Sequence, residues 1–138
     1  MGGLLILPTT VDSADVSALL HLAVGGESAR LAAALEQYRS GRTSLVGATV
    51  DGALVGIAGF RIVDNDIVLV HIATRQTERR RGIGTALVDY VRSVEPTLPI
   101  VAETDQEGVA FYRANGFTVR SLGEIYPGVE RFQVRRAP

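Results

Sequence analysis

The sequence predicts an α+β fold, a mixed α/β sandwich in which a twisted mixed sheet of six to seven strands is flanked by about four helices. Two observations predict this class, and the chain length predicts a single domain. Residues 45–73 hold three β-rich runs joined by tight turns, the pattern of an antiparallel meander. Residues 67–103 then have the pattern of strand, helix and strand, which is typical of a crossover between parallel strands. The length of 138 residues suits one core, so residues 1–138 are expected to form a single domain.

Before the meander, the chain has the pattern of a short strand and two amphipathic helices. A capping residue at the start of the first helix, a glycine pair at its end and apolar residues three or four apart predict these helices. In order, the segments are a strand at 4–7, a helix from the Asp12 or Ser13 cap to Gly25, and a helix at 28–38.

The meander strands are separated by the residues Asp51–Gly52 and Asp64–Asn65, which favour hairpin turns. Further on, Pro96 and Pro99 separate the crossover helix from its second strand. The expected segments, in order, are strands at 45–50, 54–63 and 67–73, a helix at about 82–94, a strand at 100–103, a helix at about 106–114 and strands at 117–121 and 131–135. The last two strands are expected to pair across a loop at residues 122–130.

Composition narrows the classes of function. With 14 basic and 15 acidic residues, the formal net charge of −1 gives no global reason to expect nucleic acid or an anionic membrane as a partner. Cysteine is absent, which excludes disulfides, thiolate metal sites and a cysteine nucleophile. The chain has no run of about twenty apolar residues, and its N-terminus lacks the basic flank of a signal peptide. A soluble, cytoplasmic protein is therefore expected.

A basic turn rich in glycine stands at residues 78–85, between an apolar strand and a helix. Such a turn gathers backbone N–H groups, the positive end of the helix dipole and cationic side chains around one point, which suits a phosphate. The chain has no lysine and hence no P-loop, and Leu87 stands where a dinucleotide fingerprint needs a small residue. An arginine run is usually a solvated face, but Gly82 and Gly84 beside Arg79–Arg81 favour phosphate contact.

Two short motifs stand in order on the chain, Arg79-x-x-Gly82-x-Gly84 and Phe111-Tyr112-x-x-x-Gly116-Phe117. The first resembles the loop that binds the acyl-CoA pyrophosphate in the GNAT N-acetyltransferase superfamily, and the second resembles the segment after the fifth strand of that family. The resemblance covers about residues 44–121 and implies a single-domain member of no identified subfamily. It implies transfer of an acetyl group from acetyl-CoA to a primary amine of a small molecule or peptide, by direct attack in a ternary complex.

The resemblance also implies where acetyl-CoA lies, as a co-substrate. The two parallel strands splay apart, and the pantetheine arm lies between them like an additional strand. The pyrophosphate sits on N–H groups at the start of the helix, where a Cβ would crowd it. Arg79 takes the position of a family glutamine or arginine, while one of Arg80 and Arg81 reaches the ribose 3′-phosphate or faces water. Asp105 lies near the pantetheine or only caps the next helix. The residues implied to bind the cofactor are Ile72, Ala73, Thr74, Arg79, Arg80, Arg81, Gly82, Ile83, Gly84, Thr85 and Asp105.

Acyl transfer to an amine requires a proton donor for the leaving thiolate. Tyr112 takes the position of the family tyrosine with this role, and a phenol with a pKa of about 10 keeps its proton at neutral pH. Alternatively, Tyr112 has no catalytic role and is an aromatic side chain that packs beside Phe111. A backbone N–H near Ile72 or Ala73, where the family usually has a strand bulge, is expected to stabilise the carbonyl oxygen.

The general base is the open point of the mechanism. Some family members carry a glutamate where this chain has Val68. The candidates are Glu103, at the end of the partner strand, and His71, with Glu103 slightly preferred and water as a third choice. His71 lies on the opposite face from Ile72 unless a bulge intervenes, and a buried, hydrogen-bonded histidine is as reasonable as a catalytic one. Glu103 alternatively binds a cationic acceptor or is an ordinary exposed carboxylate.

Other classes of function remain. No grouping of His, Asp and Glu has metal-ligand spacing, so no metal is expected. A non-catalytic sensor or interaction domain that binds acyl-CoA is the main alternative, which an intact Tyr112 disfavours. A nucleic-acid module around Arg79–Arg81 is disfavoured by the net charge. The first two helices and the loop at 122–130 are expected to contact the acceptor, and a homodimer through exposed sheet edges is a reasonable expectation.

Overall fold

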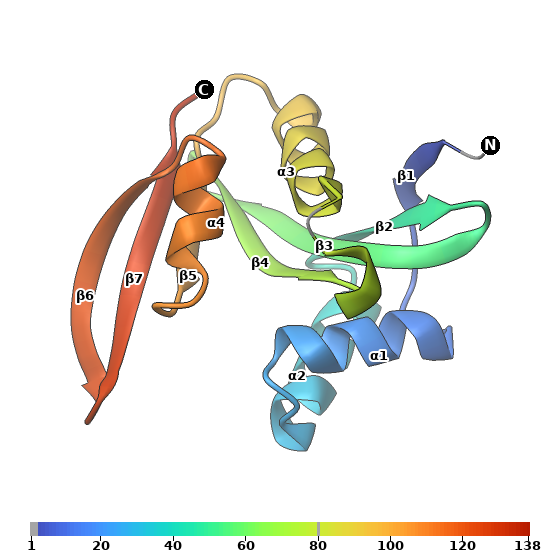
Figure 1. Ribbon diagram of the computed structural model, residues 1–138, viewed down its shortest axis with the longest axis horizontal. Coiled ribbons are helices and arrows are strands. Elements are labelled where there is room, and N and C mark those ends of the chain that lie inside the picture. The colour runs from blue at the N-terminus through green and yellow to red at the C-terminus, as the bar shows by residue number, and fades with distance from the viewer. Residues whose placement is uncertain (1–2, 80) are drawn as a thin grey trace.

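The protein folds into a seven-stranded mixed sheet with helices on both faces (Figure 1). The structure is a computed structural model that describes residues 3–79 and 81–138. The predicted α+β class, with its mixed sheet and four α-helices, is confirmed. In chain order, the elements are β1 (Leu4–Pro8), α1 (Ala14–Ala23), α2 (Ser28–Arg39), β2 (Ser44–Val50), β3 (Ala53–Val63), β4 (Asp66–Thr74), the 3₁₀ turn η1 (Gln76–Glu78), α3 (Ile83–Val94), β5 (Ile100–Thr104), α4 (Val109–Ala114), β6 (Thr118–Tyr126) and β7 (Val129–Arg136).

The strands follow the order β1-β2-β3-β4-β5-β7-β6. Among the strands of the described residues, only β4 and β5 pair in parallel, and every other neighbouring pair is antiparallel. The parallel ladder has just two residue pairs, Ile67 with Ile100 and Val68 with Val101. Beyond these pairs the two strands separate, as the family resemblance implied, and within the described residues β4 keeps a strand partner only on its β3 side.

A β-bulge in β4 changes which face its side chains point to. Gly59 of β3 stands opposite His71, but the next residue, Phe60, stands opposite Leu69, so Val70 is an extra residue. Leu69 packs into the core under α3, whereas Ala73 packs into the core under α1 and α2. His71 and Ile72 come after the bulge and therefore point to opposite faces.

Two apolar clusters hold the layers together. Leu87, Val88 and Val91 of α3 are fully buried at helical spacing and pack on one face with Tyr112 of α4. On the other face, the buried side chains of α1 and α2 pack against Leu45, Ile57 and Ala73. Helix α1 begins at the predicted cap, where the Ser13 hydroxyl accepts from the backbone N–H of Val16 at 3.1 Å.

The C-terminal part differs from the prediction in two ways. Helix α4 begins at Val109, because residues 106–108 form a turn in which the carboxylate of Asp105 accepts from the N–H of Gly108 at 3.1 Å. The expected loop at 122–130 is wrong: β6 and β7 extend through it and leave only a tight turn. Two register shifts in β6, one beside Gly123 with a φ of 84°, hide the alternation that would predict a strand.

Candidate active site

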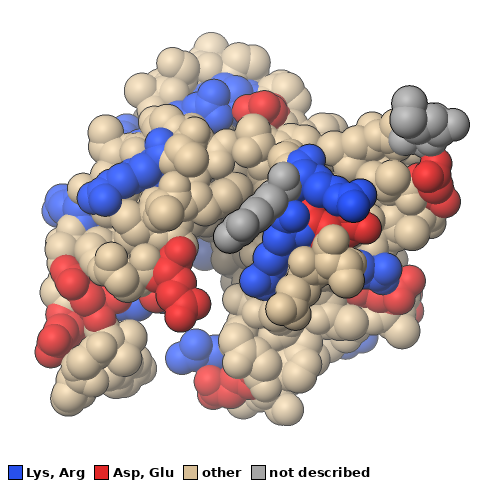
Figure 2. All heavy atoms as spheres, viewed as in Figure 1, with Lys and Arg blue, Asp and Glu red and all other residues tan. Residues whose placement is uncertain are grey.

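A cleft with a volume of about 1000 Å³ opens where β4 and β5 part. Its walls are the second half of β4, the end of β5, the first turn of α3, α4 and the end of α1. In the space-filling view it is a notch between the β6–β7 hairpin and the α1–α2 layer (Figure 2). The cleft therefore brings together segments that carry both sequence motifs.

The turn before α3 forms one end of the cleft. Gly82 has a left-handed φ of 77° and is the N-cap of α3, with no side chain capping the first N–H groups of the helix. Gly82, Ile83, Gly84 and Thr85 line the cleft, so their free N–H groups and the helix dipole stand at its wall. This end of the cleft suits an anion such as a pyrophosphate.

Basic side chains gather over this turn (Figure 2). Arg79 lines the cleft, as the phosphate role requires. Arg81 instead pairs with Glu78 at 3.4 Å, and its side chain is 71% exposed. The prediction for Arg80 lies outside the described residues. The structure thus brings Arg79 to the cleft and leaves Arg81 largely in solvent.

Gly84 has a packing reason to be glycine. A Cβ built on Gly84 would lie 2.7 Å from Cε1 of Phe111, the residue before Tyr112. The glycine therefore lets α4 approach α3 closely and brings the two motifs into contact. At Gly82 a Cβ would meet nothing within 4 Å, and the left-handed backbone itself favours glycine.

We expect Gly84→Ala to lower the free energy of unfolding by about 1–3 kcal/mol, because the added methyl overlaps the Phe111 ring. Urea denaturation of the purified variant measures this loss. In a Phe111→Ala background the same substitution is expected to cost much less, since the ring it would overlap is gone. Equal losses in both backgrounds would mean that Phe111 is not the cause.

Tyr112 forms the α4 wall of the cleft. Its side chain is only 6% exposed and lies edge-on between Phe111 and Phe117, with ring centroids 5.2 and 5.1 Å away. Burial raises the pKa of Tyr112 to about 12, against a smaller lowering by the positive charge of Arg131. The phenol therefore keeps its proton at neutral pH while it borders the cleft.

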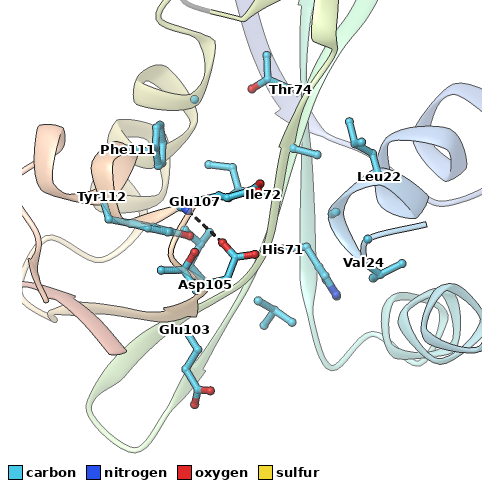
Figure 3. Close-up of a pocket in the computed structure, with 18 of the residues that line it drawn as sticks. Leu22, Val24, His71, Ile72, Thr74, Glu103, Asp105, Glu107, Phe111 and Tyr112 are labelled. Carbon is cyan, nitrogen blue, oxygen red and sulfur yellow. Dashed lines mark hydrogen bonds between the residues drawn. The ribbon is translucent and has the colours of Figure 1, made fainter. Parts of the chain in front are cut away.

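His71 lies on the opposite wall, on the α1–α2 face of β4 (Figure 3). The hydroxyl of Tyr38 in α2 lies 2.6 Å from Nδ1 of His71, and the two rings are tilted by 54°. Burial lowers the pKa of His71, so the imidazole is neutral at neutral pH. His71 is therefore both a hydrogen-bonded histidine and a residue that lines the cleft, so its position is compatible with either of its sequence interpretations.

Carboxylates stand at the β5 side of the cleft (Figure 3). Glu103 is exposed at the end of β5 and extends away from Tyr112 in this view. Asp105 lines the cleft and also stabilises the turn before α4, so its two sequence interpretations are compatible. Glu107 belongs to the same turn and lines the cleft as well.

Several cleft residues were missed by sequence reasoning. They come from segments that carry no motif. Leu22 lies in α1, Val24 directly follows α1, Arg30 lies in α2 and Arg131 lies in β7. The expectation that the first two helices reach the acceptor end was the only signal for the first three. For Arg131 no signal existed, since residue 131 was expected to open a strand behind a loop.

Neither a metal cluster nor a membrane-spanning helix occurs among the described residues. Within residues 3–79 and 81–138, no group of three or more His, Asp or Glu side chains is placed to hold a metal ion. None of the helices in those ranges is long and apolar enough to cross a membrane.

Comparison with known families identifies the family of the segment that forms much of this cleft. A family model described as an acetyltransferase (GNAT) domain matches residues 41–119. The matched range includes both the basic turn before α3 and the Phe111-Tyr112 segment of α4. No curated protein sequence matches the chain significantly.

Solved structures of similar shape are numerous. An aminoglycoside 6′-N-acetyltransferase complexed with coenzyme A is 17% identical, with a TM-score of 0.81 and 96% of each chain covered. A GNAT family acetyltransferase from Elizabethkingia anophelis with acetyl-CoA bound is 17% identical, with a TM-score of 0.77 and 98% of each chain covered. A GNAT family acetyltransferase from Bacillus cereus ATCC 10987 is 22% identical, with a TM-score of 0.74, covering 99% of this chain and 98% of that one. At these identities the likeness establishes a shared fold.

Proposed function

The chain belongs to the GNAT acetyltransferase family, and on that premise we propose that it transfers an acetyl group from acetyl-CoA to a primary amine. The acceptor is a small molecule or a peptide, which attacks directly in a ternary complex. One observation carries the proposal: β4 and β5 part beside the N-terminus of α3, and Tyr112 borders the same cleft. A turn that suits an anion, a β4 edge without a strand partner and a protonated phenol therefore border the same cleft.

The residues present fit acetyl-CoA. Beyond Val68 the backbone of β4 has no strand partner on its β5 side within the part of the chain that the structure describes, so residues 72–74 could pair with the amides of the pantetheine arm. The N–H groups of residues 81–85 and the side chain of Arg79 would hold the pyrophosphate. Two structures of the same fold were solved with coenzyme A or acetyl-CoA bound, which supports acetyl-CoA as the ligand.

Acetyl-CoA supplies the thioester, and this chain would supply the groups that move protons and stabilise charge. Tyr112 would donate its phenolic proton to the sulfur as the carbon–sulfur bond breaks. A backbone N–H at Ile72 or Ala73, on the unpaired edge of β4, would donate to the carbonyl oxygen as negative charge develops on it. Glu103 would take the proton of the attacking amine, directly or through a water molecule.

We expect Glu103→Gln to lower kcat/KM about tenfold to a hundredfold, because the amide keeps the shape of the side chain but accepts no proton. The loss should shrink as the pH rises, since more of the acceptor amine is then neutral without help. Steady-state rates across pH measure it, and Glu107→Gln, in the turn after β5, is the matched control. Equal rates for the wild type and Glu103→Gln at every pH would exclude Glu103 as the base.

The proposal is tested by calorimetric titration of the purified protein with acetyl-CoA and with CoA. A thiol-release screen over polyamines, amino acids, aminoglycosides and peptides accompanies it. Binding together with thiol release would support the enzyme and name its acceptor class. Binding without release for any amine would favour the alternative function, a sensor or interaction domain that holds acyl-CoA. Absence of binding would overturn the assignment of the turn before α3.

The remaining expectations of the sequence stay predictions. They are a single domain over residues 1–138, a homodimer through exposed sheet edges and a cytoplasmic location. The edge strands available for such a dimer are β1 and β6, the first and last strands in the sheet order. Size-exclusion chromatography with light scattering measures the oligomeric state.

A further inference from the structure

The contact between Tyr38 and His71 is built from three elements of the fold. Tyr38 comes from α2, His71 from β4, and Gly59 of β3 lies under both as the register partner of His71. A Cβ at Gly59 would overlap the hydroxyl oxygen of Tyr38. The absence of a side chain there leaves the space through which this hydroxyl reaches Nδ1 of His71. The bulge at Val70 sets the register that places Gly59 and His71 opposite each other.

The hydroxyl proton of Tyr38 needs an acceptor. The side chain is 9% exposed, and burial raises the pKa of Tyr38, so the phenol is neutral and keeps its proton. Among the described residues, Nδ1 of His71 is the only hydrogen-bond partner of this hydroxyl. A buried hydroxyl that donates to its single partner leaves the proton of the neutral imidazole on the other ring nitrogen, Nε2.

The surroundings of His71 give it no reason to carry a charge. Burial lowers its pKa, and it takes part in no ion pair within the described part of the chain. Arg30 of α2 also lines the cleft, but its guanidinium pairs with Glu27 at 3.3 Å. Glu103 belongs to the opposite wall, on β5. The contacts of His71 on this face are therefore a phenol and a glycine, and no carboxylate among the described residues forms a hydrogen bond or an ion pair with it.

We infer that Tyr38 is a positioning residue that holds His71 as a neutral imidazole with its proton on Nε2. His71 then gives the cleft a hydrogen-bond donor and cannot take the proton of the attacking amine. This role rests on the proposed function: the donor suits an acceptor that carries a hydroxyl, carbonyl or carboxylate oxygen near its amine. The amine proton goes instead to Glu103 or to water.

Nitrogen-15 NMR of the imidazole rings tests the inference without any need for turnover. The chain has two histidines, so the His21→Gln variant assigns the signals of His71. At neutral pH, the wild type is expected to show a protonated Nε2 and an unprotonated Nδ1 at His71. Tyr38→Phe should give a mixture of the two tautomers. A protonated Nδ1 in the wild type, or identical spectra for wild type and Tyr38→Phe, would overturn the inference.

Acetylation rates test the donor role separately. Glutamine places an amide N–H close to where Nε2 of histidine lies, whereas leucine places none, and neither can act as a base. We expect His71→Leu to lower kcat/KM about tenfold more than His71→Gln, as the loss of one hydrogen bond to the acceptor predicts. Equal, severe losses in the two variants would indicate a base and overturn the donor role.

The matched variant for Tyr38→Phe is Tyr90→Phe, which removes a hydroxyl from α3, outside the residues that line the cleft. We expect Tyr38→Phe to lower kcat/KM about threefold to tenfold and Tyr90→Phe to leave it unchanged. Equal effects of the two variants on kcat/KM would refute positioning by Tyr38. If no amine is acetylated, the proposed function fails, while the NMR spectra still decide the tautomer.

Discussion

Tyr112→Phe is expected to lower kcat about a hundredfold or more, the range found when a positioned acid is removed, while the affinity for acetyl-CoA stays nearly the same. The reason is that burial raises the pKa of Tyr112 to about 12, so the phenol is fully protonated at neutral pH and borders the cleft. Phenylalanine keeps the ring and loses only the hydroxyl group that carries the proton. Single-turnover rates and calorimetry on the same variant separate the two effects.

Because the pKa of Tyr112 is raised above the usual value of about 10, the phenol is expected to stay protonated at pH values up to about 10. Loss of the Tyr112 proton therefore adds no alkaline limb to the rate profile below that pH. The thermal stability of the variant is the control for a packing defect. The phenylalanine ring would keep its neighbours Phe111 and Phe117, so the variant should unfold at the same temperature as the wild type. Wild-type kcat in Tyr112→Phe would leave only the packing interpretation.

Gly82→Val is expected to weaken acetyl-CoA binding about a hundredfold or more, because each hydrogen bond to a charged phosphate contributes about 1.5–3 kcal/mol. A β-branched residue resists the left-handed φ of 77°, so the turn would shift and its N–H groups would no longer converge on one point. A side chain there would also crowd a bound phosphate. Calorimetric titration with acetyl-CoA measures the loss.

Gly128→Val is the matched control for Gly82→Val. Gly128 has a φ of 78°, and a Cβ there would meet nothing within 4 Å, as at Gly82. It stands in the turn between β6 and β7 and lies outside the residues that line the cleft. We expect similar losses of stability in the two variants, of about 1–2 kcal/mol from the left-handed backbone, and a loss of affinity only at Gly82. Equal affinities would contradict the pyrophosphate assignment.

Features that depend on neighbouring residues were predictable from the sequence. The family resemblance, the α+β class and the crossover that joins the parallel strands β4 and β5 were all confirmed. The residues of the glycine turn lie close together in the sequence, as do those of the Phe111-Tyr112 segment. Their spacing could therefore predict the local structure. The spacing did not show why Gly84 must be small, because the ring that it accommodates comes from α4.

Features that depend on distant residues were not predictable. Tyr38 and His71 are 33 positions apart, and Gly59 between them had no feature that set it apart from any other strand glycine. The family bulge was expected near Ile72 or Ala73, but it lies at Val70, where one extra residue leaves no mark on the apolar pattern. Bulges and tertiary hydrogen bonds are set by the pairing of strands and helices, which periodicity alone does not encode.

The two-pair ladder between β4 and β5 makes the sheet two smaller sheets, of four strands and three, joined by a short seam. The larger one carries α1 and α2, and the smaller one ends in the β6–β7 hairpin (Figure 1). The pantetheine arm of acetyl-CoA, with its amide groups, would lie in the gap between β4 and β5 and complete a continuous sheet across the whole molecule. The co-substrate would then act as the strand that the sheet lacks, and release of the product CoA after each turnover would open the gap between β4 and β5 again.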